Sequence, residues 1–216
     1  IIDLGGMSTR PGSDEITITE ETERIIPAIE SILATVPEAI ISIDTYRSQV
    51  ALKAIQAGAS IINDISAGDI DPELPLVAGK YKCPYIAMHM QGRPKTMQAN
   101  PTYEDVVAEI LDYFILKLDH FRSIELVDVI FDPGFGFGKT LEHNYTLLNN
   151  LGIFRILGKL ILAGLSRKGM LWRPLKSDPT KVLPATIAVN LLALQNGASI
   201  LRVHDVPENK QLVDTF

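Results

Sequence analysis

The segment Val127-Asp128-Val129-Ile130-Phe131 runs directly into Asp132-Pro133-Gly134-Phe135-Gly136-Phe137-Gly138-Lys139. A short β-branched run that stops at an acidic residue, a proline and glycines predicts a buried strand followed by a loop. The same pattern recurs, and the chain holds seven such apolar runs: Ile1–Leu4, Ala39–Ile43, Ser60–Ile65, Tyr85–Met88, Val127–Phe131, Leu160–Ala163 and Ser199–Val203. Runs that are apolar throughout are typical of parallel strands buried on both faces.

Longer segments with helical spacing separate these runs, and this alternation favours a parallel sheet flanked by helices. The segments are Glu20–Thr35, Ser48–Ala57, Tyr103–Phe121, His143–Leu157 and Thr180–Gln195. Thr19 is the predicted cap of the first helix, and Gly58 and Gly197 follow helix ends as C′ glycines do.

Polar residues stand at or just after the end of each apolar run. They are Gly5 to Gly12, Asp44 to Arg47, Asn63-Asp64, Met88-His89-Met90, Asp132 to Lys139, Ser166-Arg167-Lys168 and Arg202 to Asp205. In a parallel barrel the carboxyl ends of the strands meet at one mouth, which carries the active site. An open doubly wound sheet would gather ligand groups at one switch point instead. We therefore predict a (β/α)8 TIM barrel whose first strand is missing from this chain, because a strand pattern begins at Ile1 with nothing before it.

Composition predicts one domain over residues 1–216, N-terminally incomplete, since 216 residues with 46% hydrophobic content can fill one core. The 26 acidic and 20 basic residues give a formal charge of -6, which disfavours nucleic acid and anionic lipid as partners. No apolar run approaches the roughly 20 residues of a membrane span, and no leader pattern opens the chain. The single Cys83 cannot form an internal disulfide, and it suits a reducing cytoplasm.

The polar strand ends resemble the signatures of the dihydropteroate synthase family. Three of them carry most of the resemblance: Asp132 to Lys139, Ser166-Arg167-Lys168 and Arg202-Val203-His204-Asp205. Four more follow the family's order: Ser8 to Gly12, Ser42 to Thr45, Ile61 to Asp64, and Met88 to Gly92 with Pro94 and Thr96-Met97-Gln98. An ordered set that spans nearly the whole chain is far more specific than any single motif. Leu160 and Gly169 depart from the pattern without removing a functional residue.

This resemblance implies a transferase of folate biosynthesis. The family joins 6-hydroxymethyl-7,8-dihydropterin diphosphate to p-aminobenzoate, releases diphosphate by an SN1-like path, and is a target of sulfonamides. It also implies Mg²⁺ as cofactor, a cytoplasmic location and a homodimer. The family's Asn associated with the metal is expected upstream of Ile1, so no metal ligand is predicted within this chain.

The pterin is expected to bind polar groups at neighbouring strand ends. A buried carboxylate can accept the 2-amino and N3 hydrogens of the pterin, and Asp132 is the candidate. Asp44 and Asn63 are expected to complete the edge, with the amide donating to ring nitrogens. Lys168 is expected at the ring carbonyl or N5, and Met88 as a wall of the pocket. Each of these alone is more often a turn or capping residue than a ligand.

Arg202 and His204 alternate along the last strand and are expected to bind the leaving diphosphate together with Thr9. We predict Arg202, His204 and Lys168 as the catalytic residues, since fixed cations stabilise the charge that develops on the leaving group. The resemblance implies a p-aminobenzoate pocket, in which Phe137 could stack on the ring. Its predicted residues are Thr9, Arg10, Pro11, Phe137, Ser166 and Lys168.

Two further motifs and two alternative functions bear on this interpretation. His89 has no second ligand at metal spacing and is interpreted as structural. Lys139 is interpreted as a loop cation, because Pro133 replaces the first glycine that a phosphate loop requires. A pterin-dependent methyltransferase domain would need no diphosphate site, so Arg202 and His204 disfavour it. A catalytically silent pterin-binding module is the other alternative.

Overall fold

The computed structural model describes residues 1–8, 14–94 and 96–216. In these ranges all seven predicted strands are present, and their order in the sheet is their order in the chain. The strands are β1 (Ile2–Leu4), β2 (Ile41–Asp44), β3 (Ile61–Asp64), β4 (Tyr85–Met88), β5 (Val129–Asp132), β6 (Leu160–Ala163) and β7 (Ile200–Leu201). The bounds of β4 and β6 are those predicted, because turn residues enclose both runs closely.

The chain divides into two compact units. Unit 1 comprises Ile1–His89 and Leu116–Ile130, and unit 2 comprises Met90–Ile115 and Phe131–Phe216. Helix α4 (Val106–Ser123) contributes residues to both units. The predicted single domain over 1–216 stays a prediction.

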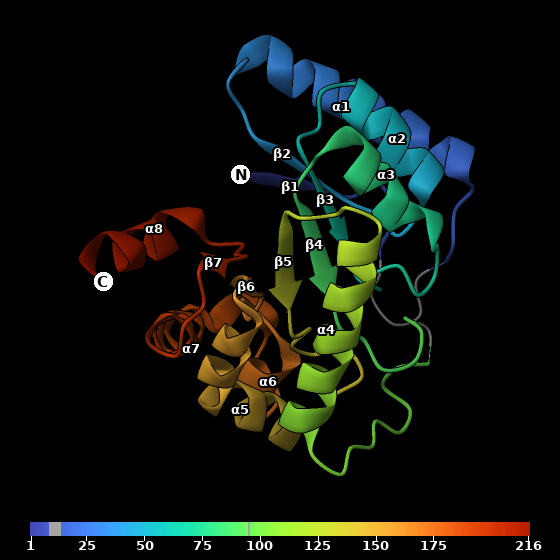
Figure 1. Ribbon diagram of the computed structural model, residues 1–216. Coiled ribbons are helices and arrows are strands. Elements are labelled where there is room, and N and C mark those ends of the chain that lie inside the picture. Colours follow the sequence, from blue (N-terminus) through green and yellow to red (C-terminus); the bar gives the residue numbers. More distant parts are fainter. Residues whose placement is uncertain (9–13, 95) are drawn as a thin grey trace. The chain divides into compact units, whose positions relative to one another are not determined.

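Unit 1 is a parallel sheet with helices packed beside one another. Its strands pair in register, with Asp3 opposite Ser42 and Asp44 opposite Asn63. The helices are α1 (Ile18–Thr35), α2 (Ser48–Gln56) and α3 (Glu73–Tyr81), where α1 packs on α2 and α2 on α3 (Figure 1). Strands β2 to β4 are almost entirely buried, as their continuous apolar character predicts.

The start of α1 differs from the prediction, because the cap is Thr17 and not Thr19. The Thr17 hydroxyl accepts a hydrogen bond from the Glu20 backbone N–H at 3.1 Å, which satisfies one of the open donors of the first turn. Gly58 ends the following helix with φ +112°, as a C′ glycine should. The cap position therefore shifted by two residues while the helix itself was predicted correctly.

Unit 2 contains the remaining helices. They are α5 (Leu141–Asn149), the 3-10 helix η1 (Leu151–Leu157), α6 (Gly169–Trp172), the 3-10 helix η2 (Pro179–Lys181), α7 (Leu183–Gln195) and α8 (Val206–Thr215). Strands β6 and β7 pair in parallel, with Ala163 opposite Leu201. The single helix predicted over His143–Leu157 is wrong, because the α-helix ends at Asn149 and the chain continues as the 3-10 helix η1 from Leu151. Figure 1 shows α7 and α8 side by side, and the two helices are in contact.

Among the residues described, no helix is long and apolar enough to cross a membrane.

Candidate functional site

The first group of predicted site residues lies at the ends of β2 and β3 in unit 1. Asp44 and Asn63 are direct partners in the sheet, so the two side chains are brought together. The Asn63 amide nitrogen donates to the Asp3 carboxylate at 3.0 and 3.3 Å. Asn63 Oδ1 is buried, and no hydrogen-bond donor reaches it within the described part of the chain. The amide therefore presents an acceptor, whereas the sequence predicted a donor to ring nitrogens.

Asp3 was missed in the sequence, although it is the one acidic residue inside the apolar run Ile1–Leu4. It lies on β1, next to β2, and orients the Asn63 amide from there. A lone carboxylate within a strand is the signal that would have identified it.

Two buried networks support these strand ends. The Asp64 carboxylate accepts the Ser66 N–H and hydroxyl at 2.8 Å, the Gly68 N–H at 2.7 Å and the Tyr85 hydroxyl at 2.5 Å. Burial raises the pKa of Asp64, and these hydrogen bonds oppose that rise. The network fixes the loop after β3.

The second network lies behind Asp44. The buried Glu21 carboxylate accepts the Thr45 hydroxyl at 2.8 Å and pairs with the Arg47 guanidinium at 2.8 Å. A buried carboxylate is tolerated because both of its oxygens are bonded. Helix α1 thus anchors the loop that follows Asp44.

In unit 2, the predicted pterin ligand and a predicted anion ligand face each other. Asp132 is 1% exposed at the end of β5, and its Oδ1 accepts the Gly134 N–H at 2.8 Å. Its Oδ2 lies 3.7 Å from Arg202 Nη2. A Cβ on Gly164 would lie 3.2 Å from Arg202 Nη2. A glycine at position 164 therefore leaves space for the Arg202 guanidinium.

The loops after β6 and β7 are joined by two contacts. Ser166 Oγ accepts the His204 backbone N–H at 3.2 Å and lies 3.0 Å from His204 Nδ1. Arg167 Nε donates to Asp205 Oδ2 at 3.2 Å, and its Nη2 contacts Oδ1. Arg167 has φ +56°, an uncommon conformation for a residue with a side chain. The structure thus gives Arg167 and Asp205 a role that the sequence did not predict.

Phe137 and Lys168, two residues of the predicted p-aminobenzoate pocket, are brought together. Lys168 Nζ lies 4.4 Å from the centroid of the Phe137 ring, within the range of a cation–π interaction. The Ser166 side chain is 3% exposed, and Phe137 and Lys168 are half-buried. His204 is exposed, which leaves its imidazole accessible to a ligand.

Lys139 is 3% exposed, so its interpretation as an ordinary loop cation is wrong. Its Nζ donates to the Phe137 carbonyl at 2.9 Å. Burial lowers the pKa of Lys139 to about 7, the nearby Asp132 raises it, and the charge of Lys168 lowers it further. The spacing of residues in the motif from Asp132 to Lys139 gave no sign that the amine of Lys139 is buried.

The remaining predicted site residues are placed as follows. Met88 and His89 are buried at the end of β4, which suits a pocket wall and a structural histidine. Thr9, Arg10 and Pro11 lie outside the described residues.

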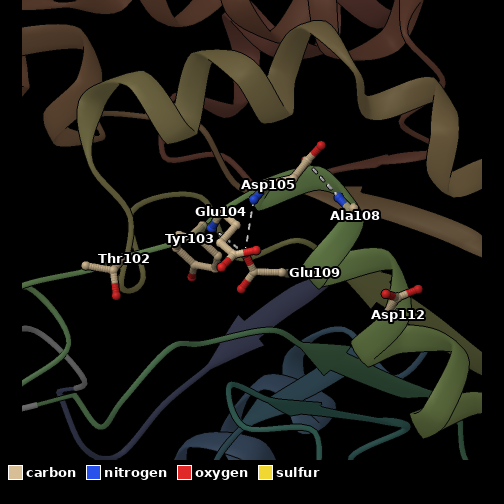
Figure 2. A pocket seen from close by; sticks show the side chains of 7 residues that line it. All are labelled: Thr102, Tyr103, Glu104, Asp105, Ala108, Glu109 and Asp112. Carbon is tan, nitrogen blue, oxygen red and sulfur yellow. Dashed lines mark hydrogen bonds between the residues drawn. The ribbon is translucent and has the colours of Figure 1, made fainter.

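A hollow of about 510 Å³ lies at the start of α4, lined by acidic residues (Figure 2). Its carboxylates serve the helix, because Glu109 accepts the Glu104 and Asp105 N–H groups at 2.7 and 3.1 Å. Asp105 accepts the Val107 and Ala108 N–H groups at 2.9 and 3.0 Å. We interpret this hollow as the capped amino end of α4, where acidic side chains are stabilising.

Comparisons with known proteins agree over nearly the whole chain. The model of the family described as pterin binding enzyme matches residues 1–204. The dihydropteroate synthase of Escherichia coli (strain K12) is 42% identical over 210 residues, which cover 96% of this chain and 74% of that protein.

Two solved structures are similar at comparable identity. The dihydropteroate synthase of Yersinia pestis, in complex with a sulfonamide drug, has a TM-score of 0.94 and 37% identity, and covers 99% of this chain and 78% of that one. The Xanthomonas albilineans enzyme with 4-aminobenzoic acid has a TM-score of 0.90 and 35% identity, with coverage of 99% and 77%. This likeness confirms the predicted α/β class and its (β/α)8-barrel type.

Proposed function

The chain belongs to the dihydropteroate synthases of the pterin binding enzyme family, and from this premise we propose how its residues carry out the transfer. The reaction joins 6-hydroxymethyl-7,8-dihydropterin diphosphate to p-aminobenzoate and yields 7,8-dihydropteroate and diphosphate. The C–O bond to diphosphate breaks, the amine nitrogen forms the new C–N bond, and the amine loses a proton. An SN1-like path places positive charge on the exocyclic methylene and negative charge on the diphosphate.

The observation that carries the proposal is the buried Asp132 carboxylate with Arg202 opposite it at 3.7 Å. One oxygen of Asp132 already accepts the Gly134 N–H, which fixes the direction of the carboxylate. A fixed carboxylate suits the donor edge of the pterin, because ionised acceptors form the stronger hydrogen bonds. We assign the 2-amino group and N3–H to Asp132.

Asn63, Asp44, Lys168 and Met88 complete the proposed pterin site on the basis of the family resemblance. Asn63 is held by Asp3 with its acceptor oxygen available, so we assign it to a ring N–H. Lys168 is assigned to the ring carbonyl or N5, and Met88 to the wall.

Arg202 and His204, together with Thr9, are proposed to bind the diphosphate. A guanidinium and an imidazole held at strand ends stabilise the leaving group more as its charge grows, which favours departure over ground-state binding. The contact between Ser166 and His204 supports this role, since it fixes the imidazole relative to the loop after β6.

Phe137, Ser166 and Lys168, with Thr9, Arg10 and Pro11, are proposed to hold p-aminobenzoate. Lys168 Nζ lies 4.4 Å from the centroid of the Phe137 ring. The ring of p-aminobenzoate could pack against the face or the edge of the same phenylalanine. Sulfonamides resemble p-aminobenzoate in shape, so we propose that they bind this pocket too.

We also propose Mg²⁺ as cofactor, where it would neutralise charge on the diphosphate oxygens. Within the described ranges, no set of three or more His, Cys, Asp or Glu side chains is arranged to hold a metal ion. We assign no step of the reaction to the ion.

A cytoplasmic location and a homodimer are proposed from the resemblance. Sedimentation of the purified protein tests the dimer, and fractionation of expressing cells tests the location.

Diphosphate release tests the proposed reaction. The protein is expected to release diphosphate from the pterin substrate only when p-aminobenzoate is added. Release without the amine, or none with it, contradicts the proposal, and pterin binding without any release indicates a silent binding module. Sulfonamides should raise the KM for p-aminobenzoate and leave kcat unchanged; an uncompetitive pattern contradicts the shared pocket.

A further inference from the structure

The loop from Gly134 to Lys139 is held at successive peptide groups around Phe137. The Gly136 N–H donates to Asn144 Oδ1 at 2.7 Å, and the Gly136 carbonyl accepts the Gln98 side-chain amide. The Phe137 N–H donates to the Gly134 carbonyl at 3.0 Å. One residue further on, the Gly138 carbonyl accepts the Tyr103 hydroxyl at 2.9 Å.

The Phe137 carbonyl, between these contacts, is held by Lys139. Lys139 Nζ donates to it at 2.9 Å, while Lys168 Nζ faces the ring of the same phenylalanine at 4.4 Å. Two lysines thus hold Phe137, one through its backbone and one through its ring. Between Phe137 and Lys139 the backbone turns at Gly138, which has a φ of +61°. A Cβ at this position would lie 2.4 Å from the Gln91 carbonyl oxygen, so a glycine is required.

An amine at this position is costly, because burial disfavours its charged form. An apolar side chain of the same length would avoid the cost unless the N–H group is needed. Its pKa of about 7 leaves a large neutral fraction at physiological pH, and a neutral amine still donates a hydrogen bond. The hydrogen bond to the Phe137 carbonyl is therefore a function that a lysine supplies here and an apolar side chain would not.

We propose that Lys139 is a positioning residue that sets the place of Phe137 and thereby the affinity for the aromatic amine substrate. The inference deepens the proposed function and rests on it. Lys139 acts on p-aminobenzoate through Phe137, and the pterin affinity depends on it much less.

The first test compares Lys139→Met with Lys139→Gln. Methionine has a similar length and no donor, and glutamine keeps a neutral N–H donor. We expect Lys139→Met to raise the KM for p-aminobenzoate about tenfold, the size of one lost hydrogen bond. The turnover number and the pterin Kd should stay within about twofold, and Lys139→Gln should recover part of the loss. Lys181→Met, an exposed lysine of the same unit, is the matched control.

A second measurement separates positioning from general destabilisation. In a Phe137→Leu background, the further change Lys139→Met should leave the KM for p-aminobenzoate unchanged, because the ring that Lys139 places is absent. An equal factor in both backgrounds overturns the inference, as does an equal loss of pterin affinity. If Lys139→Met does not fold, Lys139→Leu, which also lacks a donor, gives the same comparison in the two backgrounds.

The outcomes also distinguish the inference from the proposed function. Absence of amine-dependent diphosphate release in the wild-type protein refutes the proposed function and this inference with it. Turnover in the wild-type protein with an unchanged KM in Lys139→Met refutes the inference alone.

Discussion

Arg202 Nη2 lies 3.7 Å from Asp132 Oδ2, so the guanidinium after β7 faces the buried carboxylate that ends β5. The two residues are assigned to different parts of one substrate, Asp132 to the pterin and Arg202 to the diphosphate. Their pairing places both groups in one electrostatic unit. Substitution of Asp132 should therefore mainly weaken pterin binding, and substitution of Arg202 should mainly lower turnover.

Asp132→Asn is expected to weaken pterin binding by about 10- to 150-fold, because it removes hydrogen bonds to an ionised acceptor. The substitution keeps the shape of the side chain, so a large loss reports on charge. Calorimetry with the pterin substrate measures it, and Asp128→Asn, an exposed neighbour, is the control. Undiminished affinity in Asp132→Asn rejects the assignment.

Arg202→Ala is expected to lower kcat by about 10²- to 10³-fold, since it removes a cation aimed at the developing charge. The KM for p-aminobenzoate should change much less. Single-turnover diphosphate release measures the step, with Arg173→Ala, an exposed arginine of unit 2, as control. A rise in KM at unchanged kcat would show that Arg202 contributes only uniform binding.

The Arg167–Asp205 pair should behave as one unit. Arg167→Met and Asp205→Asn are each expected to lower the free energy of unfolding and kcat/KM, and the double variant should lose little more than either single one. Hydrogen bonding to Arg167 lowers the pKa of Asp205. Its stabilisation is therefore present above the unfolded pKa of about 3.9 and lost as the pH falls through the lowered value. Additive losses, measured by denaturant unfolding, would show that the two residues act independently.

The buried Lys139 predicts a pH dependence of stability. Its pKa falls from 10.5 to about 7 on folding, so between these values the unfolded chain binds the additional proton. The free energy of unfolding of the wild-type protein should then rise with pH relative to Lys139→Met, by up to about 1.4 kcal/mol per pH unit. Below pH 7 the difference between the two proteins should be constant and least favourable to the wild type. Urea unfolding from pH 6 to 9 checks this, and a difference independent of pH contradicts the burial of the amine.

The sequence by itself determined the strands, the class of fold and the family. Runs such as Tyr85–Met88 are recognisable because hydrophobic periodicity and turn residues are local properties. The polar strand ends were found for the same reason: Asp44 and Asp132 are the last residues of β2 and β5, and Asn63 is the last but one of β3. The errors in the helices are also local. The cap at Thr19, the break after Asn149 and the start at Tyr103 instead of Val106 are examples, and they reflect the weak energy differences between adjacent caps and between helix types.

Only the tertiary structure decided which of these polar groups touch. Asp132 and Arg202 are 70 positions apart in the chain, and neither spacing nor propensity relates them. The same holds for Asp3 with Asn63 and for Arg167 with Asp205. The burial of Lys139 is likewise set by residues brought in from other segments. A pKa, an ion pair and the direction of an amide depend on the surroundings in space, and those are created only when strands distant in sequence become neighbours in the sheet.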